Sequence, residues 1–269
     1  MADVRVIGVD GVRRRWLGVV LDLDPAGDRP GRATWLLGTA SEVLGTVTGP
    51  ATGPSPGAVA CGIDVPVGLS PSGQREADRQ ARALLGPAAR SSIFATAPQP
   101  AFAVARRVGA SRASRAEADA ASRAAGGGGI STQAWSIADK VLEVEDAVLA
   151  LGATGDRVVE VHPETTFAAM AHHFRMQPPP GKRTAAGVAE RVRLLGRTLP
   201  ALDVVDALAR VPAARSTAGL VPVDDALDAL AAACSALRHA YRQAQVLGQG
   251  AGAVWSDGSA APGRAVIVV

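Results

Sequence analysis

The chain has 269 residues, of which 48 % are hydrophobic, and a formal net charge of +3 at neutral pH. That length allows one large domain or two small ones, and the apolar content excludes a largely disordered protein. No apolar run reaches the roughly 18 residues of a membrane span, and the first residues lack the basic-then-apolar pattern of a signal peptide. We therefore expect no membrane partner, and the two cysteines, which form no disulfide framework, favour a cytoplasmic protein.

The cysteines and the basic residues further limit the classes of protein to which the chain could belong. Cys61 and Cys234 lie in apolar stretches without CxxC spacing, which excludes a disulfide framework and a zinc knuckle. Only two of the 28 cationic residues are lysines. Arginine binds phosphate bidentately, so the composition permits an anionic partner such as nucleic acid. A genome-wide bias toward Ala, Gly and Arg explains the same composition, so charge alone does not decide the function.

The first third of the chain has the pattern of strands. We expect strands at 4–10, 16–23, 33–38 and 59–64, a weak helix at 41–47 and a loop at 49–57. The short gaps between the first three strands favour antiparallel hairpins. The fourth strand ends at Asp64, because Pro66 cannot donate to a ladder.

The rest of the chain is predicted to be mostly helical. Helices are expected at 72–85, 100–108, 111–125, 132–151, 163–174, 185–195, 202–209 and 223–246, a fifth strand at 157–162, and a small hairpin from 253–255 and 265–269. This order resembles the ribonuclease H-like layout. The predicted architecture is one α/β domain, 1–269, with a mixed five-stranded sheet, helices on both faces and a helical insertion at about 71–156.

Two aspartates follow buried strands in this scheme. If the first and fourth strands are parallel neighbours, Asp10 and Asp64 lie at one edge of the sheet. Two carboxylates that close repel and raise one pKa, unless a divalent cation lies between them. The simpler alternative is that each aspartate caps a turn, Asp10 before Gly11 and Asp64 before Val65.

A third acidic element begins the last long helix. Asp225 and Asp228 are three residues apart and share a helix face, and Ala232 continues that face, so the helix can approach the sheet closely. The alternative is that Asp224 and Asp225 are first-turn acids favoured by the helix dipole. That alternative explains Asp228 poorly, because it lies in the second turn.

These three acidic segments resemble the motifs of RuvC-type Holliday-junction resolvases. The segments are 8–11 (GVDG), 63–69 (IDVPVGL) and 225–231 (DALDALA). The resolvases carry a glutamate where Asp64 aligns, and they lack the segment 160–164 (EVHPE) and the helical insertion. The resemblance therefore implies an acidic metal site and does not imply specificity for junctions.

Other segments resemble the domain of unknown function numbered 429, a group described as predicted ribonuclease H-like nucleases. The resemblance covers nearly the whole chain and rests on residues within 11–18, 75–86, 92–98, 133–143, 160–167 and 182–195.

A two-metal carboxylate site is the chemistry these resemblances imply. Two Mg²⁺ or Mn²⁺ ions roughly 3.5–4 Å apart can activate a water molecule and stabilise the leaving 3′ oxygen of a phosphodiester. Mg²⁺ prefers carboxylate oxygens and water, which suits an all-aspartate site. Asp10 is expected to bridge the ions, Asp64 to complete one of them, and Asp225 or Asp228 to complete the other.

Further polar residues are candidates for binding substrate. Glu160 and His162 alternate onto one face of the fifth strand, and Glu164 lies in the helical turn beyond. Glu160 is a candidate for a further ligand and His162 for ordering water or phosphate. The alternatives are a hydrogen-bonded core histidine, a helix-start acid at Glu164, and a second polar cluster that also includes Glu143.

Three basic residues complete the candidates. Arg75 and Arg82 share a helix face with Arg79, and they either contact phosphate or pair with the acids between them. Lys182 begins a helix after three prolines and is expected to meet phosphate, although Thr184 alone explains the helix start as its N-cap.

The sequence thus predicts a Mg²⁺-dependent nuclease or phosphodiesterase that acts on nucleic acid or another phosphodiester. One alternative is a nucleotide-binding phosphotransferase related to the actin-like ATPases. Another is a non-catalytic binding protein that retains the fold. The oligomeric state stays open, with a homodimer as one option.

Overall fold

A computed structural model describes residues 4–24, 30–48, 59–212, 221–248, 252–261 and 264–269. The chain divides into two compact units. The first unit comprises residues 1–64, 150–245 and 268–269, and the second comprises 65–149 and 246–267. The expected loop at 49–57 lies outside the described residues, and the single domain with a helical insertion stays a prediction.

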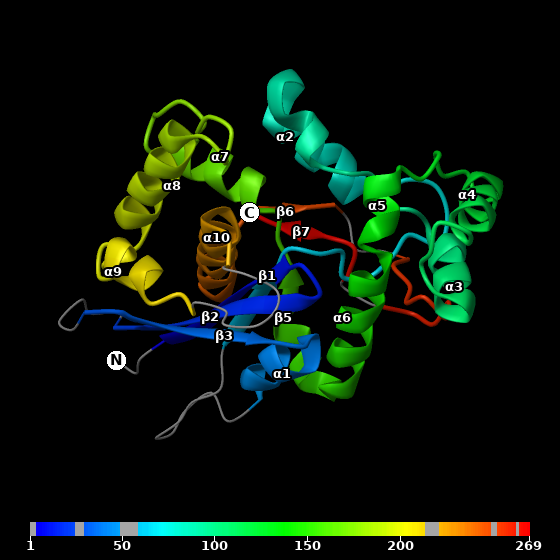
Figure 1. The fold of residues 1–269 in the computed structure, drawn as a ribbon, viewed down its shortest axis with the longest axis horizontal. Helices are drawn as coiled ribbons and strands as arrows, with labels where there is room; N and C mark the ends of the chain where they lie inside the picture. The colour runs from blue at the N-terminus through cyan, green and yellow to red at the C-terminus, as the bar shows by residue number, and fades with distance from the viewer. Residues whose placement is uncertain (1–3, 25–29, 49–58, 213–220, 249–251, 262–263) are drawn as a thin grey trace. The chain divides into compact units, whose positions relative to one another are not determined.

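The first unit contains a five-stranded mixed sheet (Figure 1). Its strands are β1 (Val4–Val12), β2 (Arg15–Leu23), β3 (Arg32–Gly38), β4 (Ala60–Ile63) and β5 (Val158–Glu160), in the order β3-β2-β1-β4-β5. The strands β1, β2 and β3 are joined as antiparallel hairpins, whereas β4 runs parallel to β1 and β5 parallel to β4. The predicted α/β class and mixed five-stranded sheet are therefore confirmed.

The first strand is longer than the sequence indicated. The prediction that Asp10 ends this strand is wrong, because pairing with β2 continues to Val12 opposite Arg15. The chain reverses within a two-residue turn, where Arg13 has a φ of 52°. On its other side β1 pairs with β4 only as far as Val9, so Asp10 lies just beyond the end of the parallel ladder.

The helices of the first unit mostly follow the expected boundaries. They are α1 (Ala40–Leu44), α7 (Pro163–His173), α8 (Ala185–Thr198), α9 (Val204–Ala209) and α10 (Val223–Ala240), with 3₁₀ turns η1 (Gly45–Val47) and η3 (Gly152–Arg157). The last helix ends six residues before the expected position 246, because the chain turns at Arg242, whose φ is 57°. None of the helices among the described residues is long and apolar enough to cross a membrane.

Helices cover both faces of the sheet, as the sequence predicted. Gly8 pairs with Val19, and the space above Gly8 is filled by Ala229 of α10. Gly18 pairs with Val9 and therefore belongs to the opposite face, where it is in contact with Val43 of α1. The main core lies on the α10 face, between the strands and the apolar side of that helix.

The helix α10 lies unusually close to the strands. A Cβ atom added at Gly8 would lie 1.9 Å from the carbonyl oxygen of Ala229, and one added at Gly62 would lie 2.4 Å from that of Ala232. These distances mean that the helix backbone rests directly on the strand backbone. Glycine on the strands and alanine on the helix allow this approach, which holds the first turns of α10 at the carboxyl ends of β1 and β4.

The second unit is mainly helical. Its elements are α2 (Glu76–Ala89), η2 (Arg90–Ser92), α3 (Gln99–Val108), α4 (Arg115–Ala124), α5 (Thr132–Ser136), α6 (Ala138–Ala150) and β6 (Val246–Leu247), which pairs with β7 (Ile267–Val268).

Three expectations for the second unit are wrong. Ser72 does not cap a helix, because Gly73 has a φ of 66° and α2 starts only at Glu76. The expected helix 132–151 breaks at Ile137 into α5 and α6. The C-terminal segments do not pair as a hairpin, since Val254 bridges to Leu69 and Ala260 instead.

Because α10 lies so close to the strands, replacing a glycine by alanine should destabilise the protein at Gly8 and should not do so at a glycine with open space around it. Gly8→Ala should lower the free energy of unfolding by about 3 kcal/mol or more, because the added methyl overlaps a backbone oxygen that cannot move without the helix. For a protein of this size that corresponds to a melting temperature roughly 6–12 °C lower in thermal unfolding followed by circular dichroism.

Gly45→Ala is the matched control within the same unit. Gly45 is right-handed helical, with φ −56° and ψ −22°, and an added Cβ there would meet no described atom within 4 Å. The control should be as stable as the wild type or slightly more stable. Equal melting temperatures for the two variants would contradict the close packing.

Candidate functional site

The sheet brings Asp10 and Asp64 to the same edge and the same face. The backbone N–H of Asp64 donates to the carbonyl of Val9 at 3.0 Å, directly after the last paired residues of the parallel ladder. Gly8 pairs with Gly62 under α10, and two residues further along each strand the same face presents Asp10 and Asp64. Asp10 is only 7 % exposed, and Asp64 is half-buried.

The first two turns of α10 add the other predicted aspartates. Asp228 is 2 % exposed, and Asp225 is half-buried one turn earlier. Burial raises the pKa of Asp10 well above its ordinary value, and the charges of Asp64, Asp228 and Asp225 raise it further. The structure thus brings all four aspartates within electrostatic range of one another. Among the described residues, no three His, Cys, Asp or Glu side chains are arranged so that they could hold a metal ion as they stand.

A lysine lies against this acidic cluster. Lys182 Nζ donates to Asp228 Oδ2 at 2.6 Å. The other oxygen, Asp228 Oδ1, is buried and has no hydrogen-bond partner in the described part of the chain. The pKa of Asp228 is raised to about 6, with burial as the main cause and with the charge and hydrogen bond of Lys182 acting in the opposite direction. Burial alone would lower the pKa of Lys182, but the charge and hydrogen bond of Asp228 outweigh it and raise that pKa.

A buried arginine holds the segment that carries Lys182. Arg191 of α8 is 1 % exposed, and its Nη1 donates to the carbonyl of Pro180 at 2.7 Å. Its Nη2 donates to both carboxylate oxygens of Glu164 at 2.8 and 2.9 Å, and its guanidinium lies 5.1 Å from the ring centre of Phe167. Thr184 caps α8 by accepting from Gly187 N–H, as expected. Arg191 therefore joins the loop before α8 to the start of α7 and fixes the position of Lys182.

Glu160 and His162 occupy different surroundings from the aspartates. Glu160 is paired with Ile63 in the ladder, which places it on the face opposite Asp64. It is buried, and its charge contributes to the raised pKa of Asp64. His162 lies at the N-cap position of α7, where its carbonyl oxygen accepts from the N–H groups of Thr165 and Thr166.

The carboxyl of Asp64 is strongly perturbed. Burial and, after it, the charge of Asp228 are the main causes that raise its pKa to about 8, while Lys182 lowers it and Glu160 and Glu164 add smaller increases. A carboxyl with this pKa keeps its proton over much of the neutral range. Ionising all the carboxyls of the cluster at neutral pH therefore costs free energy.

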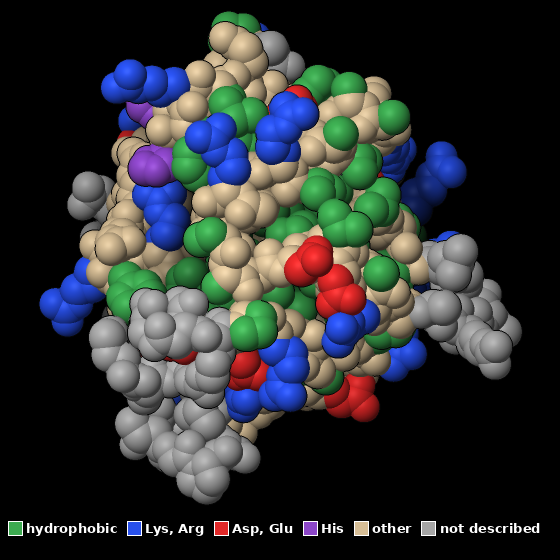
Figure 2. Space-filling model, turned by 90° about the vertical axis from the view of Figure 1, so that its left-hand side faces the viewer, with side chains coloured by type: hydrophobic (Ala, Val, Ile, Leu, Met, Phe, Trp, Pro, Cys, Tyr) green, Lys and Arg blue, Asp and Glu red, His purple; other side chains and the backbone are tan. Residues whose placement is uncertain are grey.

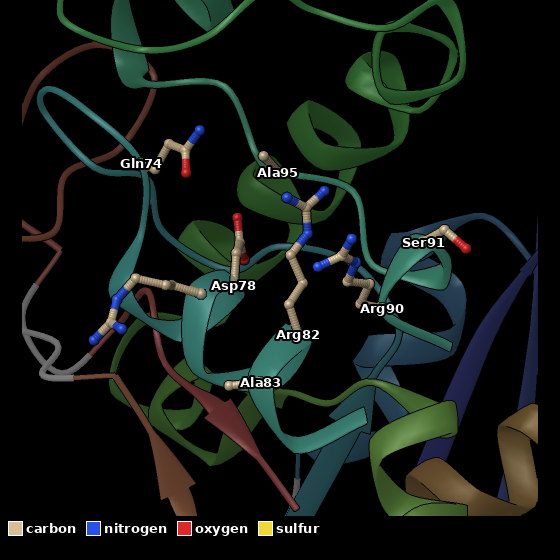
Figure 3. Close-up of a pocket in the computed structure, with 8 residues that line it drawn as sticks. Gln74, Asp78, Arg82, Ala83, Arg90, Ser91 and Ala95 are labelled. Atoms are coloured by element: carbon tan, nitrogen blue, oxygen red, sulfur yellow. The ribbon is translucent and has the colours of Figure 1, made fainter. Parts of the chain in front are cut away.

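The two predicted arginines lie in the second unit. Arg75 is buried at the N-cap of α2, donates to Asp78 at 2.5 Å and also donates to the carbonyl of Gly68. Its guanidinium is therefore occupied by protein groups. Arg82 donates through Nε and Nη2 to the carbonyl of Ile93 and lines a pocket (Figure 3).

Basic side chains are dispersed on the face drawn in Figure 2. Among the residues that are coloured there, Lys and Arg form several small groups, separated by uncharged and hydrophobic side chains. A partner that bound this face through its phosphates would therefore contact several separate groups of basic side chains.

The class of protein defined by these observations is an α/β protein with four aspartates and a lysine gathered at the carboxyl edge of a mixed sheet. Comparison with known families then shows that the chain belongs to the family described as "Protein of unknown function (DUF429)", whose profile matches residues 8–251. No curated protein and no solved structure matches the sequence.

The raised pKa of Asp64 predicts how stability varies with pH. An acid whose pKa is higher in the folded chain than its ordinary value of 3.8 binds its proton more tightly in the folded state. The free energy of unfolding of the metal-free protein should therefore fall as the pH rises from about 4 to about 8. Asp64→Asn should reduce this fall, measured by denaturant unfolding at a series of pH values.

Asp206→Asn is the matched control, because Asp206 is exposed in α9 and pairs only with Arg210 one turn away among the described residues. It should keep the pH profile of the wild type. Parallel profiles for Asp64→Asn and the wild type would mean that Asp64 is not the titrating group.

Proposed function

We propose that the first unit is a Mg²⁺- or Mn²⁺-dependent hydrolase of phosphodiester bonds, a nuclease with a ribonuclease H-like fold. The observation that carries the proposal is the gathering of buried and half-buried carboxylates, which raise one another's pKa, from β1, from the residue after β4, and from α10. Such an arrangement lowers the stability of the fold, because burying an uncompensated carboxylate costs free energy. Its presence therefore supports a functional role.

The donor atoms suit a hard divalent cation. The four predicted ligands Asp10, Asp64, Asp225 and Asp228 supply only carboxylate oxygens, which Mg²⁺ and Mn²⁺ prefer. The partnerless Oδ1 of Asp228 is the kind of buried acceptor that a cation or its water would satisfy. When bound, the cation activates a water molecule and stabilises charge on the leaving oxygen.

The sheet order supports the fold assignment. Three antiparallel strands, then two parallel strands on the other side of β1, with α10 packed across the centre, resemble the ribonuclease H-like layout. In that layout the acidic residues of the first strand, the fourth strand and the last helix act together. Here these positions are Asp10, Asp64, and Asp225 with Asp228.

The protein groups around the carboxylates would position the substrate. Lys182 lies beside Asp228, so its ammonium could donate to a phosphate oxygen that enters the same space. Arg191 and Glu164 would act only by holding the Lys182 loop, since the carboxylate accepts both of its hydrogen bonds from Arg191. Glu160 and His162 stay candidates for substrate contact, and the substrate remains a nucleic acid or another phosphodiester.

One observation favours a second candidate, a non-catalytic binding protein that retains the fold. The Lys182 ammonium already neutralises Asp228 at 2.6 Å. A lysine in that position replaces part of the charge that a metal ion would otherwise supply.

Metal binding tests the proposal directly. Millimolar Mn²⁺ should raise the melting temperature of the wild type, since a ligand that binds only the folded state stabilises it. Asp10→Asn and Asp228→Asn should lose this shift and the cleavage of labelled DNA or RNA. Without metal, Asp10→Asn should be as stable as the wild type or more stable at pH 8, because it removes a carboxylate with a raised pKa.

Asp206→Asn serves again as the exposed control and should keep both the Mn²⁺ shift and the cleavage. If Mn²⁺ shifts the wild type and both buried variants equally, the aspartates do not hold the metal. Unimpaired cleavage by both variants would exclude the proposed reaction.

Lys182→Met separates the two candidate functions. If Asp228 is a metal ligand, removing the competing ammonium should strengthen Mn²⁺ binding several-fold in calorimetry, since the carboxylate oxygen is released and a like charge is removed. If the lysine serves only to neutralise Asp228, the variant should lose stability and gain no affinity for Mn²⁺.

A further inference from the structure

We propose that a pocket beside α2, in the second unit, binds a phosphate monoester, the terminal group of a small phosphorylated metabolite. This inference does not depend on the proposed hydrolase activity, because every residue that forms the pocket lies in the second unit.

The pocket is large enough for a small molecule. Its volume is about 470 Å³, within the range of roughly 300–1,000 Å³ that is typical of ligand sites. It is lined by Gln74, Asp78, Arg79, Arg82, Ala83, Arg90, Ser91 and Ala95 (Figure 3).

The acidic residue in the lining is fully engaged. Asp78 is buried, and its Oδ1 accepts from Arg75 at 2.5 Å. Its Oδ2 accepts from the backbone N–H of Thr96 at 2.7 Å. The negative charge of Asp78 is therefore balanced by Arg75 and does not neutralise the arginines that line the pocket.

Two of the three lining arginines keep an unbalanced charge. Arg79 is paired with Glu76. Arg82 uses Nε and Nη2 on the neutral carbonyl of Ile93, at 2.9 and 2.8 Å, which leaves its Nη1 for another acceptor. The exposed side chain of Arg90 has no hydrogen bond or ion pair to any residue that the structure describes, whereas its backbone N–H donates to the carbonyl of Gly86. The pocket thus contains two guanidinium groups, those of Arg82 and Arg90, that pair with no carboxylate in the part of the chain that the structure describes.

A kink in α2 brings these two arginines to one pocket. In a straight helix, residues eight apart are separated by about 12 Å along the axis. Gly86 has a φ of 67° and a ψ of −175°, and Pro87 follows, so the helix breaks there and the chain continues into η2. The break lets Arg90 line the same space as Arg82, and Figure 3 shows the Arg90 guanidinium directed toward the Arg82 side chain.

The chemistry of the lining defines the class of ligand. Guanidinium groups bind phosphate through paired, charge-assisted hydrogen bonds, and two positive charges match a doubly charged monoester better than a singly charged diester. The lining includes Ala83 and Ala95 and no aromatic side chain on which a base could stack. Recognition would therefore rest on the phosphate group, with Gln74 available for a hydroxyl of the attached moiety.

Calorimetry with the full-length chain at fixed ionic strength tests the proposal. The probes are inorganic phosphate, ribose 5-phosphate and adenosine monophosphate, with ribose and an oligonucleotide that lacks terminal phosphates as comparisons. All three phosphate probes should bind, whereas ribose should not. Comparable affinities for ribose 5-phosphate and adenosine monophosphate would locate recognition in the shared phosphate, and tighter binding of inorganic phosphate would identify the free ion as the ligand.

Arg90→Ala should weaken binding of the phosphate probes at least tenfold without changing the melting temperature, because the Arg90 side chain is exposed and has no described partner. Arg112→Ala is the matched control, since it removes the same charge from another exposed position of the second unit and should bind within twofold of the wild type. Asp10→Asn should also bind like the wild type, which separates this site from the acidic cluster.

Three results would overturn the proposal. One is the absence of phosphate binding at millimolar concentration, and the second is equal weakening in Arg90→Ala and Arg112→Ala. The third is binding of the oligonucleotide alone, with loss in Arg90→Ala, which would assign the pocket to a nucleic-acid backbone.

Discussion

The contact between α10 and the centre of the sheet determines most of what the first unit can do. Gly8 and Gly62 remove the side chains that would keep the helix at an ordinary distance, and the small residues of α10 bring its backbone onto theirs. This contact buries the middle of the helix completely and places its first two turns beyond the strand ends. Asp225 and Asp228 reach Asp10 and Asp64 only because the helix lies so low on the sheet.

That geometry places several carboxylates close together in a largely buried site. Burial is the main cause that raises the pKa values of Asp10, Asp64 and Asp228, nearby acidic side chains raise them further, and Lys182 offsets only part of the effect. Close carboxylates with raised pKa values are typical of sites that bind cations or transfer protons. A buried arginine, Arg191, also holds the loop that carries the Lys182 ammonium, through its hydrogen bonds to Pro180 and Glu164.

Much of this architecture follows from local sequence pattern. Apolar runs and short gaps predicted the three hairpin strands to within about two residues, whereas the parallel pairing of β1 with β4 entered only as a condition that the structure meets. The break between α5 and α6 could not be predicted from the sequence, because the apolar spacing continues across Ile137. The start of α2 was misplaced because Ser72 looks like an N-cap, while Gly73 takes a left-handed conformation that no pattern reveals.

The candidate site was predicted unevenly for a related reason. The aspartates could be found because each lies near the end of a recognisable strand or in the first two turns of a helix, although β1 continues two residues beyond Asp10. Lys182 was predicted to meet phosphate, but its pairing with Asp228, 46 residues away, depends on a loop whose course no periodicity describes. Arg191 had no site role in the sequence analysis, since a buried arginine in an amphipathic helix resembles any other basic residue. Only its hydrogen bonds to Pro180 and Glu164 disclose what it does.

The order of segments in the first unit also bears on how the protein is made. The strands β1, β2 and β3 leave the ribosome early, yet the helix that covers their apolar face begins at Val223. At usual translation speeds of about 5–20 residues per second, that face waits roughly ten to forty seconds for its cover. During synthesis the hairpin sheet therefore exposes apolar surface, and we expect the nascent chain to bind chaperones until its last sixth, which begins with α10, has emerged.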